Sequence, residues 1–311
     1  MQKLLASLKA STNNTTALLQ LFAQLLSLQQ LPHPGTKSKR PFYCRIWCPV
    51  VTLWYMIWQR LSPQHTLAAV VADARRGGAD ALRPGDKPLS ARLRSNATTA
   101  YSNARARLPL AWVQECFHQM AQALANLATG PLEDQSLPVR RLDGSTVRLR
   151  PHGDIPQQFP PHRTGHRPTY WCLARVVVAF CGATAMALGA QIGSIYTSEQ
   201  TLAVQLILRS AARALYVGDR NFGVWRVVRA CVQTGGHALV RLTCARAQRL
   251  AAGRRLQAGL DMVVRWTASA QDQLDPGLSP DSVVGRLVVV RARRRGWRTQ
   301  TLILFTSLVD A

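Results

Sequence analysis

The sequence predicts a mixed α/β fold in which a helical domain precedes a sheet. Apolar stretches separated by helix-capping residues run from about residue 46 to 127, whereas short apolar runs typical of strands dominate from Val139 onward. Between Asp143 and Asp219, 76 residues apart, the order reads strand, strand, helix, strand. With 311 residues and 47% hydrophobic content, the chain is long enough for two or three domains with a sizeable core.

Residues 1–40 predict a basic N-terminal arm. The first 72 residues contain no acid, and Lys37, Lys39 and Arg40 follow a stretch with two prolines. A short helix followed by a flexible basic segment fits this composition, and so does a partly disordered tail.

Residues 41–130 predict a helical DNA-binding domain. A strongly apolar run ends at Ser62, which can cap a new helix with Pro63 at its first position. We expect that helix over residues 66–74 and two more over residues 98–108 and 110–127. Gly130 begins a linker that reaches residue 137.

The remaining elements are predicted in a regular order. Strands are expected at 139–142 and 146–149, followed by a proline-rich loop at 151–169 and a hairpin at 173–180 and 183–191. A helix capped by Ser198, with Glu199 in its first turn, should come next. A strand at 214–217 and a helix at 225–234 follow it. Short strands then follow at 238–244, 262–266, 283–292 and 301–309. We divide this part into the first part of a catalytic core (136–234), a β-rich insertion (235–298) and a returning core strand (299–311).

The net charge of the chain indicates a polyanionic binding partner. Lys and Arg number 39 against 15 acids, a net charge of +24, so nucleic acid is the leading partner and anionic membrane the second. A charge-free stretch at 176–193 could span a bilayer, but its β-branched residues and three glycines favour a hairpin, and we expect no membrane partner. Seven cysteines, an odd number placed partly in apolar runs, indicate buried thiols in a reducing compartment.

Asp143 and Asp219 are the candidate catalytic acids. Each stands just past an apolar run, where a strand is expected to end, and an RNase H-like sheet brings two such carboxylates to one edge. A carboxylate pair there can hold Mg²⁺ over a phosphodiester. Structural roles compete with this interpretation: Asp143-Gly144 is a good hairpin turn, and Asp219 could cap the following helix.

Several motifs along the chain resemble the insertion-sequence 4 type of bacterial DDE transposases. Leu142-Asp143-Gly144-Ser145-Thr146 is similar to the motif around the first catalytic aspartate, and residues 218–223 (Gly-Asp-Arg-Asn-Phe-Gly) to the second. Residues 49–54, 61–65 and 100–109 resemble the N-terminal domain, whereas residues 240–242, 253–255 and 296–302 resemble the β-rich insertion and the returning strand.

The resemblance implies a DNA transposase that binds terminal inverted repeats, hydrolyses each strand and joins the freed 3′-hydroxyl to target DNA. Asp143 and Asp219 would bind Mg²⁺ or Mn²⁺, and the enzyme would act as a homodimer in a paired-end complex, in the nucleoid of a bacterial cytoplasm. We expect five arginines to contact DNA: Arg105, Arg107, Arg220, Arg241 and Arg298.

The third acid of the family is not found. It would lie on a helix after the returning strand, within a Tyr, Arg, Glu and Lys signature, but no glutamate follows Glu199 and the sequence ends at Ala311. We therefore expect a C-terminally truncated product that lacks the final catalytic helix and is catalytically incompetent. The alternatives are a non-catalytic DNA-binding fragment that competes with the intact transposase, a membrane-associated basic protein, and a poorly folded pseudogene remnant.

Overall fold

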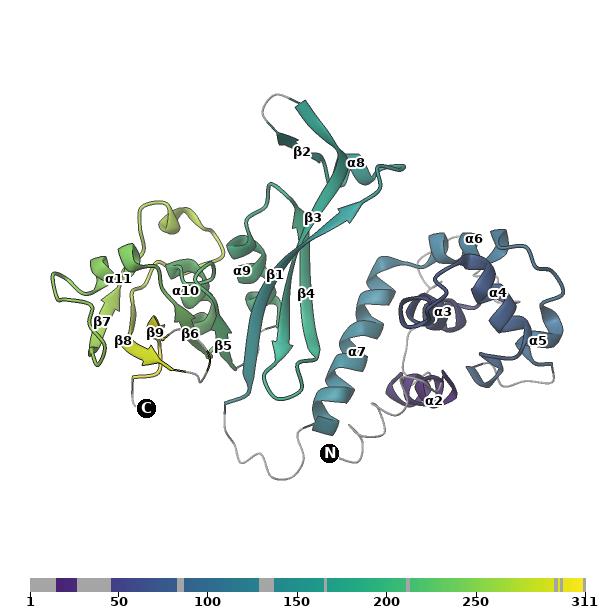
Figure 1. Cartoon of the computed structure of the whole chain (residues 1–311), viewed down its shortest axis with the longest axis horizontal. Coiled ribbons are helices and arrows are strands. Elements are labelled where there is room, and N and C mark those ends of the chain that lie inside the picture. Colours follow the sequence, from purple (N-terminus) through teal and green to yellow (C-terminus); the bar gives the residue numbers. More distant parts are fainter. Residues whose placement is uncertain are drawn as a thin grey trace. The chain divides into compact units, whose positions relative to one another are not determined.

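The chain forms two compact units, residues 1–130 and residues 131–311, each described here by itself (Figure 1). The structure is a computed structural model that describes residues 15–26, 46–82, 87–128, 137–164, 167–210, 213–293, 296 and 299–309. The basic run at Lys37–Arg40, most of the predicted linker and Arg298 lie outside these residues.

Unit 1 is built from helices. They are α2 (Thr15–Leu25), α3 (Pro49–Leu61), α4 (Leu67–Arg75), the 3-10 turn η1 (Asp80–Leu82), α5 (Leu89–Arg92), α6 (Thr99–Arg107) and α7 (Leu110–Ala128). The three helices predicted after Ser62 are confirmed, but the cap of the first was placed wrongly. Ser62 ends α3, its N–H donating to the carbonyl of Trp58, and the hydroxyl of Thr66 caps α4 by accepting from the Ala69 N–H at 3.1 Å. No helix among the described residues is long and apolar enough to cross a bilayer.

Aromatic rings fill the core of unit 1 and carry their polar atoms into hydrogen bonds. Tyr101 donates its hydroxyl to Oε1 of Gln59 at 2.9 Å, and Tyr55 donates to Oδ2 of Asp73 at 3.0 Å. Burial raises the pKa of Tyr101 to about 12 and, as the largest influence, raises the pKa of the Asp73 carboxyl above its ordinary value. Unit 1 thus has a packed core of its own.

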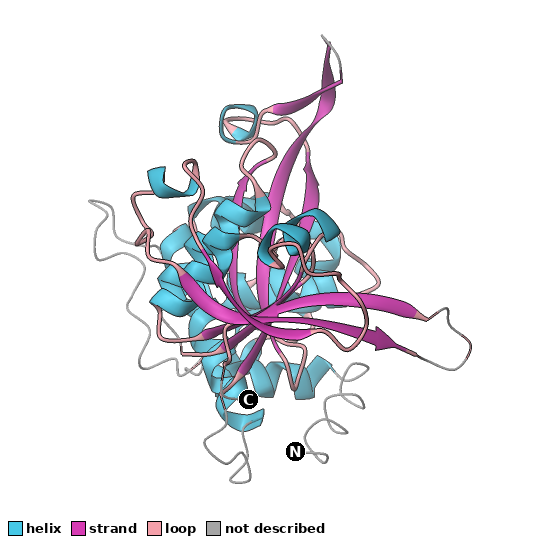
Figure 2. Cartoon of the chain, turned by 90° about the vertical axis from the view of Figure 1, so that its left-hand side faces the viewer, coloured by secondary structure: helices cyan, strands magenta, loops and turns pink. Residues whose placement is uncertain are grey.

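Unit 2 contains one sheet of nine described strands. They are β1 (Val139–Leu149), β2 (Pro161–Thr164), β3 (Arg167–Cys181), β4 (Ala187–Ser194), β5 (Leu215–Gly218), β6 (His237–Arg241), β7 (Asp261–Trp266), β8 (Val283–Ala292) and β9 (Gln300–Thr306). Their order is β2-β3-β1-β5-β6-β9-β8-β7, with β4 also paired to β3. Strands β1, β5 and β6 are parallel, and the other pairings are antiparallel. The β2–β3 and β8–β9 hairpins project from the sheet as two arms (Figure 2).

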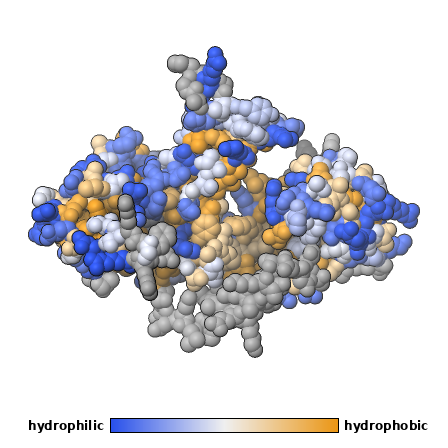
Figure 3. Space-filling view, in the orientation of Figure 1, coloured by the Kyte–Doolittle hydropathy of each residue, from blue (hydrophilic) through white to orange (hydrophobic). Residues whose placement is uncertain are grey.

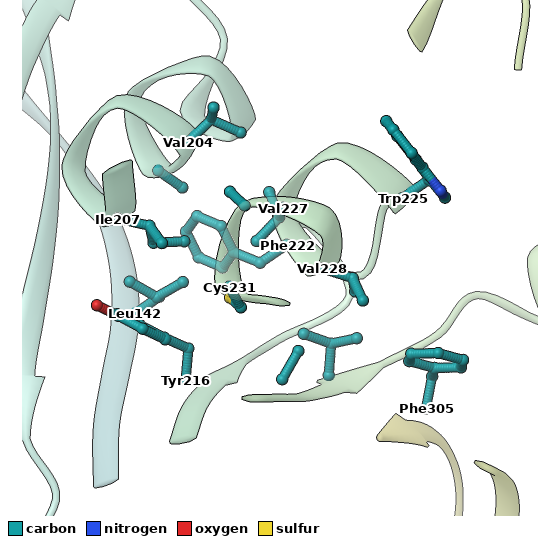
Figure 4. Packing of buried hydrophobic residues seen from close by; sticks show 14 of the residues in the cluster. Leu142, Val204, Ile207, Tyr216, Phe222, Trp225, Val227, Val228, Cys231 and Phe305 are labelled. Carbon is teal, nitrogen blue, oxygen red and sulfur yellow. The ribbon is translucent and has the colours of Figure 1, made fainter. Parts of the chain in front are cut away.

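Two helices bury the centre of this sheet. Helix α9 (Glu199–Ser210) packs on β3 and β4, and α10 (Trp225–Gln233) packs on β6. Leu142 of β1, Tyr216 of β5 and Phe222, at 6%, 1% and 2% exposure, meet residues of both helices in one cluster (Figure 4). The predicted cap of α9 is confirmed, because the Ser198 hydroxyl accepts from the Thr201 N–H at 3.0 Å.

The structure corrects several parts of the sequence interpretation. Residues 151–169 are not a loop: they contain α8 (Ile155–Gln158), β2 and the start of β3. A strand that begins with Pro161 is tolerated because β2 lies at the end of the sheet, where one row of N–H groups needs no partner. The predicted strand at 238–244 stops at Arg241, and α11 (Cys244–Leu250) follows, capped by Thr243.

Strand β6, which we assigned to the β-rich insertion, instead pairs in parallel with β5 at the centre of the sheet, and β9 continues the same sheet from β6. Strands β7 to β9 extend the same sheet. The uncharged stretch at 176–193 lies in β3, β4 and their connection, as the hairpin interpretation requires.

Candidate active site

Parallel pairing brings the two predicted acids to the same level of the sheet. Arg140 of β1 pairs with Tyr216 of β5, and Arg141 pairs with Val217. The pairing ends there, and the same register continued by two residues would put Asp143 level with Asp219, the first residue after β5. Because neighbouring strands lie about 4.8 Å apart, the register brings together two acids that are distant in sequence.

Neither aspartate has the structural role that competed with catalysis. Asp143 and Gly144 are not in a turn, since β1 continues through them and pairs them with Val178 and Val177 of β3. The prediction that a strand ends just before Asp143 is therefore wrong. Asp219 does not cap α10, whose N-cap is Val224.

Each aspartate is held by a short local hydrogen bond and remains exposed. Asp143 Oδ1 accepts from the N–H of Gly144 at 2.9 Å, and Asp219 Oδ1 accepts from the N–H of Asn221 at 2.8 Å. The second bond is an Asx-turn, which fixes the aspartate at the end of a strand. In each carboxylate, the other oxygen makes no hydrogen bond recorded among the described residues, so it can bind a ligand.

Glu199 contacts Gly144 and Asn221, which are close in sequence to the two aspartates, although the sequence indicated only a helix-start role for it. As the first residue of α9, it accepts a hydrogen bond at Oε2 from the side-chain amide of Asn221, and its Oε1 lies 3.9 Å from Nε of Arg175. A Cβ added to Gly144 would lie 2.6 Å from Cδ of Glu199. The Glu199 carboxylate therefore rests against β1 at the residue that follows Asp143.

Gln200 completes the connection between α9 and the turn after Asp219. Its side-chain amide donates to the Oδ1 of Asn221 at 2.8 Å and to the Asn221 carbonyl at 3.1 Å. The start of α9 therefore holds Asn221 by two side chains, and Asn221 in turn donates its backbone N–H to Asp219. We call Glu199, Gln200 and Asn221 the α9 clamp.

The donor set suits a hard divalent cation bound by few protein ligands. Mg²⁺ prefers carboxylate oxygen and is usually held by one or two carboxylates together with waters and substrate phosphates. The described part of the chain contains no group of three or more His, Cys, Asp or Glu side chains close enough to hold a metal ion. The carboxylates of Asp143 and Asp219 are oxygen donors of the kind that Mg²⁺ or Mn²⁺ takes.

The predicted DNA-contacting arginines of unit 2 lie in different settings. Arg220 follows Asp219 directly and is exposed, and its carbonyl accepts from Nη1 of Arg246 at 3.2 Å. Arg241 is half-buried at the end of β6. Arg220 is thus the exposed neighbour of Asp219 in the chain, while Arg298 lies outside the described residues.

In unit 1 the two candidate arginines differ from each other. The guanidinium of Arg105 lies 5.7 Å from the ring centroid of Tyr101 and is half-buried, which gives it a packing role. Arg107 is exposed, with Nε donating to the carbonyl of Asn103 at 3.2 Å. Of the two, Arg107 has the freer side chain for a phosphate contact.

Comparison with known proteins gives only distant structural similarity. No protein-family model matches the chain, and no curated protein does. A piggyBac transposase synaptic complex with hairpin DNA is similar at a TM-score of 0.39 and 9% identity, over 94% of this chain and 61% of that one. An endonuclease V from Bacillus subtilis is similar at a TM-score of 0.23 and 11% identity, over 62% of this chain and 75% of that one.

Proposed function

We propose that unit 2 is an RNase H-like, metal-dependent DNA-processing domain of the transposase and nuclease type, with Asp143 and Asp219 as its metal ligands. The observation that carries the proposal is the parallel register of β1 and β5, which would bring the two acids level if it is continued past its last pair. The strand order β4-β3-β1-β5-β6, with α9 and α10 as the connections to β5 and β6, fits such a core.

Each part of the site has a chemical task in this proposal. A divalent cation bound there would neutralise phosphate charge and lower the pKa of an attacking water. Asp143 and Asp219 supply its oxygen ligands, and their local hydrogen bonds hold them in place. Arg220, exposed beside Asp219, is placed to attract the phosphate that approaches the pair.

The net charge of +24 supports DNA as the partner, because cationic surfaces gain affinity by releasing counterions from phosphates. We propose the ends of an insertion sequence and its target DNA as substrates, with a homodimer as the active assembly. These finer statements depend on the resemblance of the sequence motifs. Incompetence of this chain for want of a third acid stays a prediction.

Metal binding tests the acid pair directly. Titration of the full chain with Mn²⁺, followed by electron paramagnetic resonance, should show a site that Asp143→Asn and Asp219→Asn each weaken by more than about tenfold. Asp154→Asn is the matched control, since Asp154 is also an exposed acid of unit 2. If the wild-type chain binds no Mn²⁺, or if all three variants bind it equally, the proposed site is wrong.

Strand cleavage of labelled end-sequence DNA with Mg²⁺ or Mn²⁺ then measures the competence of this chain. Cleavage that disappears in Asp143→Asn but persists in Asp154→Asn would show an active enzyme and contradict the expected incompetence. Metal binding without cleavage would support an incompetent relative of the transposases. Cleavage that survives Asp143→Asn would remove the acid pair from the mechanism.

A second candidate function rests on unit 1, a separate compact unit with exposed Arg107. It is a DNA-binding fragment that occupies element ends and blocks the intact enzyme. A gel-shift assay with specific and scrambled ends discriminates, since binding that ignores sequence and disappears at moderate salt would be charge attraction alone. Arg107→Ala should weaken specific binding, and Arg60→Ala, another exposed arginine of unit 1, is its control.

A further inference from the structure

The arm formed by β2 and the start of β3 displays aromatic rings to solvent. Tyr170 is 68% exposed and Trp171 is 41% exposed, both in β3, and Tyr196, in the connection after β4, is 58% exposed. Among the described residues, these three are the aromatic members of the exposed large apolar set, and all three belong to this region. Exposed aromatic side chains gathered in one place mark an interaction surface.

The rings are held in place rather than loosely attached. Tyr170 and Trp171 meet edge to face, with centroids 5.3 Å apart and planes at 84°. Tyr196 donates its hydroxyl to the carbonyl of Pro161 in β2 at 3.1 Å, which ties the connection after β4 to the arm. A ring with a fixed position and a free face can stack on a flat partner at a low entropy cost.

The charge of the arm selects the kind of partner. No acid occurs between residues 155 and 196, and the arginines around the rings are exposed and enter no ion pair in the described part of the chain; they are Arg148, Arg150, Arg163 and Arg167. Figure 3 shows hydrophilic residues at the tip of the arm and a hydrophobic surface at its base. Aromatic rings among unpaired arginines are the combination that binds single-stranded nucleic acid, with rings stacking on bases and guanidinium groups contacting phosphates.

We propose that the β2–β3 arm binds unpaired nucleotides by stacking their bases on Tyr170 and Trp171. Bases within a duplex hide their faces in the stack, so the arm selects a single-stranded tail, a flipped base or a hairpin tip. Stacking itself does not need the acid pair, but the role given to it in DNA processing rests on the proposed function.

The length of β3 sets how far the unpaired bases lie from the acid pair. Val178 is the direct cross-strand partner of Asp143, and Tyr170 lies eight residues before it in the same strand. At about 3.3 Å per residue this is roughly 26 Å. Duplex DNA, at about 3.4 Å per base step, spans that distance in roughly eight steps. The arm is therefore placed to engage a strand about eight nucleotides from a phosphate held at Asp143.

Binding of a labelled thymidine oligonucleotide to the full chain, without added metal, tests the stacking. Fluorescence anisotropy should show that Tyr170→Ala/Trp171→Ala weakens binding by about 5- to 150-fold for each stacked base lost. An abasic oligonucleotide of the same length keeps the phosphates but offers no base. The wild type should bind it more weakly than thymidine, and the double variant should bind both alike.

A control variant keeps the result interpretable. Ile192→Ala removes a 56% exposed apolar side chain from β4 in the same unit and should leave binding unchanged. The assay contains no metal and does not depend on metal binding by the acid pair, so failure of the acid pair and failure of the arm are distinguishable. Circular dichroism of the double variant checks that its fold is retained.

Three outcomes would overturn the proposal. One is equal wild-type affinity for the thymidine and abasic oligonucleotides, which would mean that charge attraction accounts for all of the binding. Another is a well-folded double variant that binds thymidine within twofold of the wild type. The last is a wild type that binds vesicles of anionic lipid but shows no preference for the thymidine over the abasic oligonucleotide. If the double variant loses this vesicle binding, the arm is a membrane-binding surface.

Discussion

Replacing Gly223 by alanine should destabilise unit 2 strongly, because this residue has no room for a side chain. It follows Phe222 in the turn between Asp219 and α10. A Cβ there would overlap the carbonyl oxygen of Arg241 in β6, with the carbonyl carbon at 3.2 Å and Cδ2 of Leu242 at 3.3 Å. Gly223 is not among the glycines with positive φ, so the requirement is for space and not for backbone conformation.

The magnitude follows from what must move. A carbon and a carbonyl oxygen need about 3.3 Å between them, so the turn or β6 must shift by roughly 1 Å. Strand β6 is held on both sides, with Val240 paired to Gly218 and Arg241 to Leu304, so a shift breaks backbone hydrogen bonds. Leaving one or two of these groups unsatisfied costs about 3–4 kcal/mol. For a unit of this size that lowers Tm by roughly 6–16 °C.

Calorimetry and urea denaturation of the full chain would measure the loss. Gly253→Ala is the matched control, because Gly253 has φ +88 and open space around the added Cβ, so only backbone strain of about 1–2 kcal/mol is expected. Gly223→Ala should be the more destabilising of the two by about 2 kcal/mol. Equal losses in the two variants would show that the turn after Asp219 does not approach β6 as closely as described.

Three further predictions concern the core, the clamp and pH. Phe222→Ala, at a 2% exposed position, should lower the free energy of unfolding by about 3–5 kcal/mol, and an unchanged denaturation midpoint would contradict its burial. Asn221→Ala should weaken Mn²⁺ binding by about 10- to 100-fold without removing a ligand, and wild-type affinity would show that the α9 clamp does not position Asp219. The pKa of the Asp73 carboxyl is raised in the folded state, so folding favours the protonated carboxyl. Asp73 therefore contributes stability below its ordinary pKa, and this contribution is lost as the pH rises through the folded-state pKa. Asp73→Asn, which keeps an acceptor for Tyr55, should flatten that part of the pH–stability curve, and an unchanged slope would refute it.

Local signals predicted most of the elements that carry the site. Capping by Ser198, the apolar run before Asp219 and the hairpin around Gly182 each depend on a few neighbouring residues, and all three appear in the structure. The elements that were missed depend on distant partners. Strand β2 begins with Pro161 and exists because β3 supplies its hydrogen bonds, and β6 lies at the centre of the sheet because β5 and β9 flank it.

The α9 clamp shows why part of the site could not be predicted. In the sequence, Glu199 is an acid in the first turn of a helix, a common position that needs no partner. Its contact with Asn221 arises only when the start of α9 lies against the turn after β5. A usable signal was the glycine after Asp143, since β1 has room for Glu199 only where Gly144 lacks a side chain.

The position of the acid pair is fixed by residues that have no chemistry of their own. Leu142 precedes Asp143 in β1, and Phe222 follows Asp219 by three residues, and both are buried in the cluster formed with α9 and α10. Side chains alternate along a strand, so a slip of β1 by one residue would expose Leu142 and turn the Asp143 carboxylate into that apolar cluster. Burying an unpaired carboxylate costs far more than exposing a leucine, so the core excludes the slipped register. The register of β1 on which the proposed site depends is therefore a consequence of hydrophobic packing, and changes to the core should weaken metal binding at the proposed site even where Asp143 and Asp219 are unchanged.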